Sequence, residues 1–313
     1  MNNQKEKNFI SAVVYLRNNE KNITNFIKLL EQLLSSIFDN FEIIFVNDAS
    51  ADNTREIIKT YCKEHHISSI TIVNMSIYHG LEAAMIAGVE LAIGDFVYEF
   101  DTIEVDYSSD LVFKLYKHLQ TGYDIVRASP RQPIKLSSKV FYYFYNKYAS
   151  SMYPLTTETF RLLSRRAINR IRSLSTTLRY RKAHYANCGL RMDIIHYEKI
   201  SIDHKSKKQK KDKNRKSIAF DSLILYTTIA QKISIGVTFS LMLFSVFIAL
   251  YTLFVFLNKH PIEGWTTTML FVSIGFFGIF GILSIVIKYL TIIVELVFKE
   301  RNYLVESVEK ISE

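Results

Sequence analysis

Cysteine is scarce in this sequence of 313 residues, which contains only Cys62 and Cys188. Their spacing fits neither a metal site nor a framework of paired cysteines, so we expect free thiols and a reducing compartment. A secretory leader is also not expected. The polar start (MNNQKEKN) is followed by an apolar run that is too short and lacks a small-residue cleavage site.

Charged residues are missing from two long stretches, 233–257 and 265–287. Each is longer than the roughly 20 residues that a helix needs to cross a bilayer. The short connection between them predicts a transmembrane hairpin, with spans at 233–257 and 265–289 and with both ends on one side of the membrane. The alternative, a buried helical hairpin in a soluble protein, fits spans of this length poorly.

Positive charge exceeds negative charge, with 39 Lys+Arg against 30 Asp+Glu, and the surplus is local. The strongest run, 205–216 (KSKKQKKDKNRK), precedes the hairpin, and further basic residues follow it. By itself such a run fits a solvated loop or a nucleic-acid patch. Beside two spans it favours anionic lipid headgroups, so we expect a bilayer partner, no nucleic acid, and both termini in the cytoplasm.

The part of the chain before the basic run alternates between strand and helix patterns. We predict strands at 9–16, 41–46, 70–73, 96–100 and 123–126, with amphipathic helices between them. This rhythm indicates an α/β fold with a mostly parallel sheet and right-handed crossovers. The predicted order is an α/β domain at 1–203, a basic linker and interfacial helix at 204–232, the hairpin at 233–294 and a cytoplasmic tail at 295–313.

A basic and aromatic stretch at 130–150 allows two interpretations. One is an amphipathic helix on the domain surface. The other is a lid, or a surface that meets lipid headgroups, since Tyr and Lys side chains suit that boundary. The sequence does not separate them.

Acidic residues cluster where the predicted strand 96–100 ends, in the segment that includes Glu99, Asp101, Glu104 and Asp106. Ligands of open α/β sheets bind beyond the carboxyl ends of the strands. Glu99 and Asp101 are two residues apart on a strand, so their side chains point to the same side and can reach one cation.

Several segments carry a family pattern in the same order along the chain. They are the first strand and the turn after it (11–14 and 18–23), the loop 46–54 (V-D-D-G-S-x-D-x-T in the family), the helix and strand 80–101, the segment 160–166 (F-R-L-x-x-R), the entry to the second span at 264–266 and the tail 295–306. Together they resemble the membrane-bound family 2 glycosyltransferases of the polyprenyl-phosphate sugar synthase type. That group includes dolichyl-phosphate mannose synthase and bacterial bactoprenol glucosyltransferases.

The resemblance implies a GT-A fold, the fold of nucleotide-diphospho-sugar transferases. It also implies transfer of a sugar from a nucleotide-sugar donor to a polyprenyl phosphate at the cytoplasmic leaflet, with a possible homo-oligomer. Asp48 then contacts the nucleobase or ribose, although an Asx turn capping the next helix is the plainer interpretation. The remaining residues carried over from the family for the nucleotide sugar are Asn18, Glu20, Glu82 and Asp101.

The resemblance also implies a metal site and a catalytic pair. Asp101 corresponds to the first acid of the family's D-x-D motif, which holds a divalent cation, Mg²⁺ or Mn²⁺, on the donor pyrophosphate. The second acid is replaced by Ile103, and Glu99 is the best-placed substitute ligand. Arg161 is the candidate phosphate contact and, with Asp101, the candidate catalytic residue; its alternative role is a surface helix residue.

Other departures from the family pattern leave the function open. Thr156, Thr157 and Glu158 occupy the stretch where the family has an acidic residue before F-R-L. Cations on the leaving group or on the acceptor phosphate could compensate, and Arg131, Lys139 and Arg165 are the candidates. Two alternatives therefore remain beside the transferase: a weak or inactive homologue that serves as a membrane scaffold or regulatory subunit, and a transferase for a different membrane acceptor.

Overall fold

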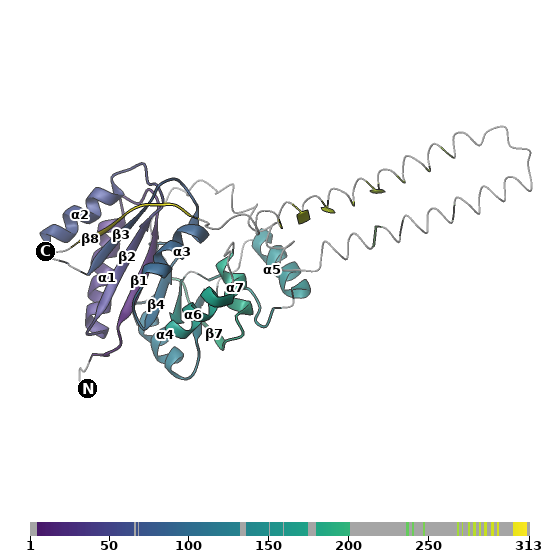
Figure 1. The fold of residues 1–313 in the computed structure, drawn as a ribbon. Helices are drawn as coiled ribbons and strands as arrows, with labels where there is room; N and C mark the ends of the chain where they lie inside the picture. The colour runs from purple at the N-terminus through teal and green to yellow at the C-terminus, as the bar shows by residue number, and fades with distance from the viewer. Residues whose placement is uncertain are drawn as a thin grey trace, which may run out of the picture. The chain divides into compact units, whose positions relative to one another are not determined.

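The computed structural model describes residues 5–65, 67, 69–131, 136–149, 151–158, 160–174, 180–200 and 303–311, with isolated positions between 236 and 293. The chain divides into two compact units. One comprises Met1–Asn146, Ser151–Ile218 and Glu300–Glu313, and the other comprises Lys147–Ser150 and Ala219–Lys299. The first unit holds the sheet and every residue discussed as a site below (Figure 1).

The described strands form one mixed sheet in the order β7-β5-β6-β4-β1-β2-β3-β8. Their bounds are β1 Ile10–Leu16, β2 Phe41–Asn47, β3 Ile70–Met75, β4 Phe96–Phe100, β5 Ile125–Pro130, β6 Phe160–Ser164, β7 Met192–Tyr197 and β8 Val305–Ile311. The central strands β4, β1, β2 and β3 are parallel. This confirms the predicted α/β fold with a mostly parallel sheet.

Helices cover both faces of the sheet. On one face, the apolar residues of α1 (Ile23–Ile37), α2 (Thr54–Glu64) and α4 (Asp110–Gln120) join one hydrophobic cluster with the strands. On the other face, α3 (Leu81–Leu91), α6 (Arg165–Leu174) and α7 (Arg181–Asn187) join a second cluster. Residues that recur every three or four positions supply these buried faces, as their spacing predicts.

Helix α3 lies unusually close to the sheet because of a glycine. A Cβ atom at Gly88 would come within 2.5 Å of methyl groups of both Val13 and Val46. Only glycine lets the helix backbone approach β1 and β2 this closely. One residue of the apolar face predicted for this helix is not buried: Leu91 is 41% exposed.

Three parts of the sheet differ from the predictions. Strand β5 begins and ends later than the predicted 123–126. The segment that contains Arg161 is the buried strand β6, antiparallel to both β4 and β5, and not a surface helix. The predicted tail 295–313 contains β8, which pairs with β3 in the antiparallel sense.

Helix α5 (Leu136–Tyr148) falls in the basic and aromatic stretch, where a helix is predicted. The predicted linker at 204–232 and hairpin at 233–294 lie outside the described residues, apart from isolated positions. Among the helices within the described ranges, none has the length and apolarity needed to span a bilayer.

Candidate functional site

Two aspartates stand at the carboxyl ends of the parallel strands that flank β1. In the β1–β2 pairing, Leu16 lies opposite Asn47, so Asp48 follows the end of β2. In the β1–β4 pairing, Val14 lies opposite Phe100, so Asp101 follows the end of β4. Because parallel strands end at the same edge, both carboxylates belong to the edge where ligands of open α/β sheets bind.

Asp48 is fully buried and is held by uncharged donors. One oxygen, Oδ1, accepts the backbone N–H of His79 at 2.8 Å. The other, Oδ2, accepts the Gly80 N–H at 2.8 Å and the Tyr15 hydroxyl at 2.9 Å. Gly80 has a φ of 85° and immediately precedes α3, so Asp48 ties the end of β2 to the start of that helix.

The loops after β1 and β2 brace each other. The Asn18 side-chain oxygen accepts the Ala51 N–H at 2.8 Å. The Asn18 backbone N–H donates to the Ser50 hydroxyl. The Glu20 carboxylate accepts the Asn53 N–H at 3.3 Å. The structure therefore brings Asn18 and Glu20 to the Asp48 loop, where they fix its shape.

A row of charged side chains crosses the neighbouring strands. Glu99 on β4 lies opposite Arg161 on β6, and Arg161 lies opposite Arg127 on β5. The Arg161 guanidinium donates to Glu99 Oε2 at 2.9 Å and to Asp101 Oδ2 at 2.6 Å. Its Nε lies 3.0 Å from Glu158 Oε2, close enough for an ion pair but without the alignment of a hydrogen bond.

A second arginine, Arg181 at the start of α7, closes this cluster from another direction. Its guanidinium donates to Glu99 Oε2 at 2.6 Å, to Asp101 Oδ1 at 2.8 Å and to Glu82 Oε2 at 3.1 Å. The remaining oxygen of Glu99 accepts the Tyr185 hydroxyl. We call these six residues (Glu82, Glu99, Asp101, Arg161, Arg181 and Tyr185) the arginine–acid cluster.

The cluster is desolvated and strongly polarised. Burial would raise the pKa of Asp101, but the adjacent guanidinium groups of Arg161 and Arg181 outweigh it and lower that pKa to about 2. Burial would also lower the pKa of Arg181, yet Glu99, Glu82 and Asp101 raise it well above its ordinary value. Burial and the charge of Glu99 raise the pKa of Tyr185. Asp101 and Arg181 are therefore charged and Tyr185 is neutral at neutral pH.

The carboxylates of the cluster do not fit the metal site that the sequence predicted. The Glu99 side chain is 0% exposed, and both of its oxygens already accept hydrogen bonds. Both oxygens of Asp101 are bound by arginine. Ile103 is buried in an apolar cluster, and no group of three or more His, Cys, Asp or Glu side chains within the described ranges is arranged to hold a metal ion.

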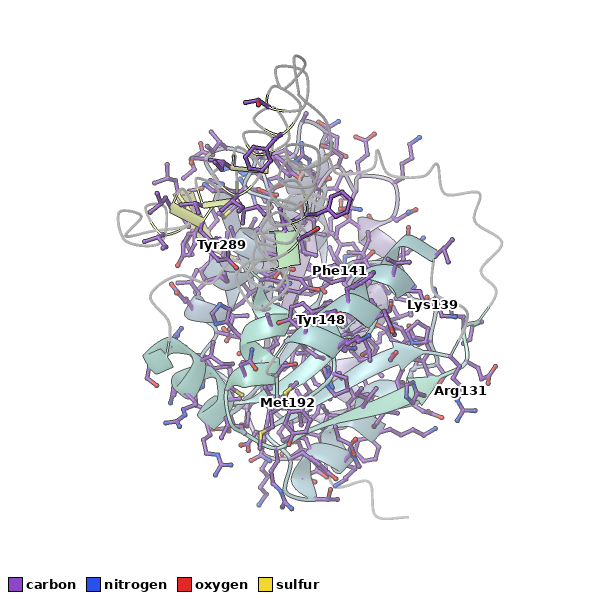
Figure 2. All side chains as sticks on the ribbon, turned by 90° about the vertical axis from the view of Figure 1, so that its right-hand side faces the viewer. Arg131, Lys139, Phe141, Tyr148, Met192 and Tyr289 are labelled. Carbon is purple, nitrogen blue, oxygen red and sulfur yellow. The ribbon has the colours of Figure 1, made fainter. Side chains whose placement is uncertain are left out.

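One of the three predicted acceptor cations, Arg165, does not lie at the carboxyl edge. Arg131 is exposed and forms a long ion pair of 3.6 Å with Glu198, and Lys139 is exposed on α5 (Figure 2). Arg165 donates to the backbone carbonyls of Ala92 and Gly94, which precede β4. It thus lies at the amino end of that strand, opposite to the carboxyl edge. Arg165 is part of the scaffold and not of the candidate site.

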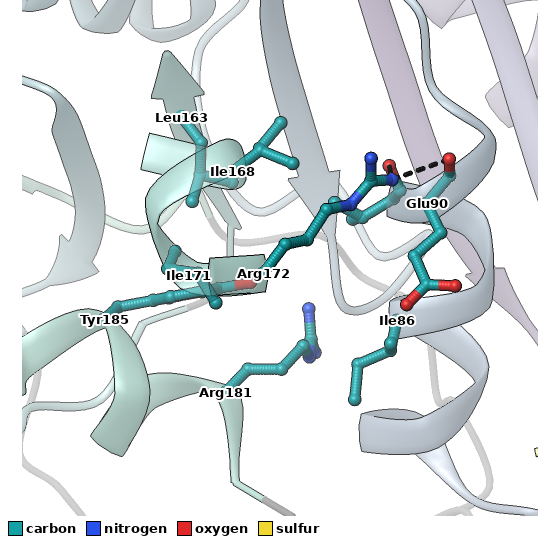
Figure 3. Close-up of a pocket in the computed structure, with 9 residues that line it drawn as sticks. Ile86, Glu90, Leu163, Ile168, Ile171, Arg172, Arg181 and Tyr185 are labelled. Atoms are coloured by element: carbon teal, nitrogen blue, oxygen red, sulfur yellow. Dashed lines mark hydrogen bonds between the residues drawn. The ribbon is translucent and has the colours of Figure 1, made fainter. Parts of the chain in front are cut away.

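A small pocket lies between α3, α6 and α7, with Ile86, Leu163, Ile168 and Ile171 among its lining residues (Figure 3). Arg172 reaches across from α6 and donates to the Glu90 carbonyl at 2.7 Å. Arg181 and Tyr185 form part of the wall, but neither Asp48 nor Asp101 does. The pocket therefore borders the arginine–acid cluster at Arg181 and Tyr185 and does not include the two aspartates of the carboxyl edge.

Comparison with known proteins decides the family. The sequence model described as glycosyl transferase family 2 matches residues 11–172, just over half of the chain. The chain belongs to glycosyl transferase family 2. The match contains Asp48, Glu99, Asp101 and Arg161, whereas Arg181 and Tyr185 lie beyond it.

Three curated relatives are 27–29% identical to this chain over the residues that align. An uncharacterized glycosyltransferase of Synechocystis is 29% identical, covering 61% of each chain. A putative glycosyltransferase of Bacillus subtilis, CsbB, is 28% identical over 62% of this chain, and a prophage bactoprenol glucosyl transferase homolog of Escherichia coli is 27% identical over 63%. The chain spans 61%, 60% and 66% of the length of these three relatives.

Solved structures agree on the fold. The mannosyltransferase PcManGT of Pyrobaculum calidifontis, in complex with GDP-Man and Mn²⁺, superposes with a TM-score of 0.50 at 15% identity. The match covers 71% of this chain and 63% of that one. It supports the predicted GT-A-like fold for the part of this chain that carries the sheet.

The sequence did not identify two charged side chains that pair with the predicted site residues, Arg181 and Glu158. Arg181 lies outside the matched segment and was not singled out by any motif. Glu158 was noted only as a departure from the family pattern, yet it is buried against Arg161 and Arg127. One weak signal is present in the sequence. Arg181 and Tyr185 are four residues apart on one helix, a spacing that places both side chains on the same face.

Proposed function

We propose that this chain is a membrane glycosyltransferase that moves a sugar from a nucleotide-sugar donor to a polyprenyl phosphate on the cytoplasmic leaflet. The observation that carries the proposal is the position of Asp48 and Asp101 at the carboxyl ends of the two strands that flank β1. Ligands of open α/β sheets bind at such an edge. Membership of family 2 assigns sugar transfer as the class of reaction.

Two considerations support polyprenyl phosphate as the acceptor: the names of the relatives and the charge of the phosphate. Several relatives are named bactoprenol glucosyl transferases. A polyprenyl phosphate is largely dianionic at neutral pH, since its second pKa is about 6. Its oxygen can attack the anomeric carbon while the bond to the donor diphosphate breaks, without a base to remove a proton. Inversion at the anomeric carbon is then expected.

The membrane part of the proposal rests on the uncharged stretches 233–257 and 265–287 and on strand β8. Because β8 pairs with β3, residues on both sides of these stretches belong to one sheet. A chain that leaves and rejoins the same sheet crosses a bilayer an even number of times. This supports a two-span hairpin with both termini in the cytoplasm, where the basic run 205–216 faces anionic headgroups.

The full chain in detergent or nanodiscs provides the test. Purified protein is incubated with undecaprenyl phosphate and with each radiolabelled donor in turn, including UDP-glucose, UDP-N-acetylglucosamine and GDP-mannose. We expect a lipid-linked sugar with at least one donor, and a loss of at least tenfold in rate for Asp48→Ala and for Asp101→Asn. Glu56→Gln is the matched control, because Glu56 is an exposed carboxylate on α2.

A second function is favoured by one observation. Every carboxylate oxygen of Glu99 and Asp101 already accepts a hydrogen bond from the chain itself. Such a saturated site also suits a scaffold or regulatory subunit that has lost activity. Absence of lipid-linked product with every donor, from protein that is folded, would favour the scaffold. Product with a lipid other than a polyprenyl phosphate would identify a different membrane acceptor.

A further inference from the structure

We infer that Arg161 and Arg181 occupy the place that a divalent cation would take between Glu99 and Asp101, so that this site works without a bound metal. The inference rests on the proposed function, because it concerns the same edge of the sheet. It reverses the expectation of a Mg²⁺ or Mn²⁺ site at Asp101 and Glu99.

The first argument is the occupancy of the ligand atoms. Arg161 and Arg181 each donate to both carboxylates, at distances between 2.6 and 2.9 Å. Charge-assisted hydrogen bonds of this length are strong, and the paired arginines already neutralise the two acids. A divalent cation bound to the same oxygens would lie beside two guanidinium groups, and like charges at such range repel strongly where water is excluded.

The second argument is that the arginines cannot easily move aside. Arg161 is 0% and Arg181 is 1% exposed, and each has an additional anchor. Glu158 pairs with Arg161, and Glu82 accepts both the Nε and the backbone N–H of Arg181. Displacing either guanidinium would deprive buried acids of a charged partner, which is strongly destabilising.

The third argument is the lack of substitute ligands along the segment that follows β4. Ile103 is buried among apolar side chains, and the Thr102 hydroxyl accepts the Glu104 N–H. Asp106 is paired with Lys199 at 2.8 Å and accepts the Tyr197 hydroxyl. Glu104 is the exposed carboxylate of this segment, and Mg²⁺ and Mn²⁺ need several hard oxygen ligands. No group of three or more His, Cys, Asp or Glu side chains among the described residues is arranged to supply them.

The consequence concerns the donor's phosphates. Asp101 is the member of the Glu99–Asp101 pair that keeps some exposure, 11% of its side chain, and its charge is already balanced by arginine. Lys182, beside Arg181, lowers the pKa of Asp101 together with the two arginines. An anionic diphosphate can thus approach this edge without meeting an uncompensated carboxylate. Fixed guanidinium charges, and not a metal, then offset the negative charge of Glu99 and Asp101.

Direct Mn²⁺ binding tests the inference without relying on transferase activity. Free Mn²⁺ is followed by electron paramagnetic resonance in the presence of the full chain, alone and with UDP or GDP as the probe nucleotide. We expect the wild-type protein to remove no more Mn²⁺ from solution than the Asp101→Asn variant does. Micromolar Mn²⁺ binding that is lost in Asp101→Asn would overturn the inference.

Arg181→Gln provides the opposite arm. Removal of this guanidinium frees Asp101 Oδ1 and takes away one of the two arginines beside Glu99 Oε2. We therefore expect Mn²⁺ binding at least tenfold tighter than in wild type. Arg170→Gln, at an exposed arginine on α6, is the matched control and should leave Mn²⁺ binding unchanged. Unchanged Mn²⁺ binding in folded Arg181→Gln would contradict the view that arginine blocks the site.

A third readout covers the case in which Arg181→Gln does not fold. The rate of sugar transfer by wild type is measured in two separate conditions. One contains excess EDTA, and the other contains about 10 mM Mn²⁺, enough to fill a divalent-cation site of millimolar affinity. We expect the two rates to differ by less than twofold. A tenfold or larger loss with EDTA would overturn the inference. If no transfer occurs in either condition, the proposed function fails while the Mn²⁺ titration of wild type against Asp101→Asn still decides the metal question.

Discussion

Asp48 and Asp101 occupy equivalent places on either side of β1, yet the chain holds them in different ways. Asp48 accepts two backbone amides and one tyrosine hydroxyl, all of them neutral donors. Asp101 accepts two guanidinium groups. The first arrangement fixes the shape of a loop and the start of a helix, whereas the second fixes charge. A carboxylate buried at the sheet edge can thus be stabilised either by neutral donors or by guanidinium groups, and the two kinds of partner contribute differently to the free energy of unfolding.

The largest effect is expected on the charged side. In Arg181→Met, three acids lose a buried partner, and we expect the free energy of unfolding to fall by about 3–5 kcal/mol. Pulse proteolysis of the full chain in urea and detergent measures this change. Arg131→Met is the control, because its ion pair with Glu198 is exposed and is expected to contribute about 0.5 kcal/mol or less. Equal losses in the two variants would mean that the cluster is solvated.

The second prediction concerns acid. The pKa of Asp101 is lowered from 3.8 to about 2, so its stabilising effect is complete above pH 4 and is lost as the pH falls toward 2. This difference between the folded and the unfolded pKa of Asp101 corresponds to about 2 kcal/mol. Unfolding measured between pH 5 and pH 2 should decline more steeply in wild type than in Asp101→Asn. Parallel curves for the two proteins would contradict the pairing with Arg161 and Arg181.

A smaller effect is expected on the neutral side. Tyr15→Phe removes one of three donors to Asp48 and leaves both backbone amides in place. A hydrogen bond to a charged group contributes about 1.5–3 kcal/mol. Because two amide donors remain, we expect a loss at the lower end of that range by pulse proteolysis. A loss as large as that of Arg181→Met would remove the distinction between the two sides of β1.

The smallest effect is a gain. Ala49 follows Asp48 with a φ of 48°, a left-handed conformation in which the family pattern has glycine. Ala49→Gly relieves a strain of about 1–2 kcal/mol but adds backbone entropy to the unfolded chain, so we expect a net stabilisation of about 0.5–1 kcal/mol. The control is Ala51→Gly, since Ala51 is not among the described residues with positive φ. It should be neutral or destabilising.

Much of the sheet could be predicted because its signals are local. Strand β4 has the predicted bounds, and β1, β2 and β3 differ from theirs by one or two residues. Runs of β-branched and apolar residues between amphipathic helices indicate the parallel strands at the centre of the sheet. The same logic placed Asp48 and Asp101 at one edge, since residues that follow parallel strands emerge on the same side.

The antiparallel strands were not predictable in this way. Arg161 lies on β6, which inserts between β4 and β5 although it follows both in the sequence. Strand β8 returns to β3 from more than 200 residues away. Neither pairing leaves a periodic pattern in the sequence, because the partner strands are set by packing and not by neighbours along the chain.

By itself, the sequence determined the parallel α/β core, the family and the two aspartates at the strand ends, because hydrophobic period and motif order are properties of short segments. Only the tertiary structure decided what those aspartates contact. Arg181 reaches Glu99 across 82 residues of chain, and Tyr185 reaches it across 86. Buried charges must find partners wherever the fold places them, and that requirement converted a predicted metal site into an arginine–acid cluster.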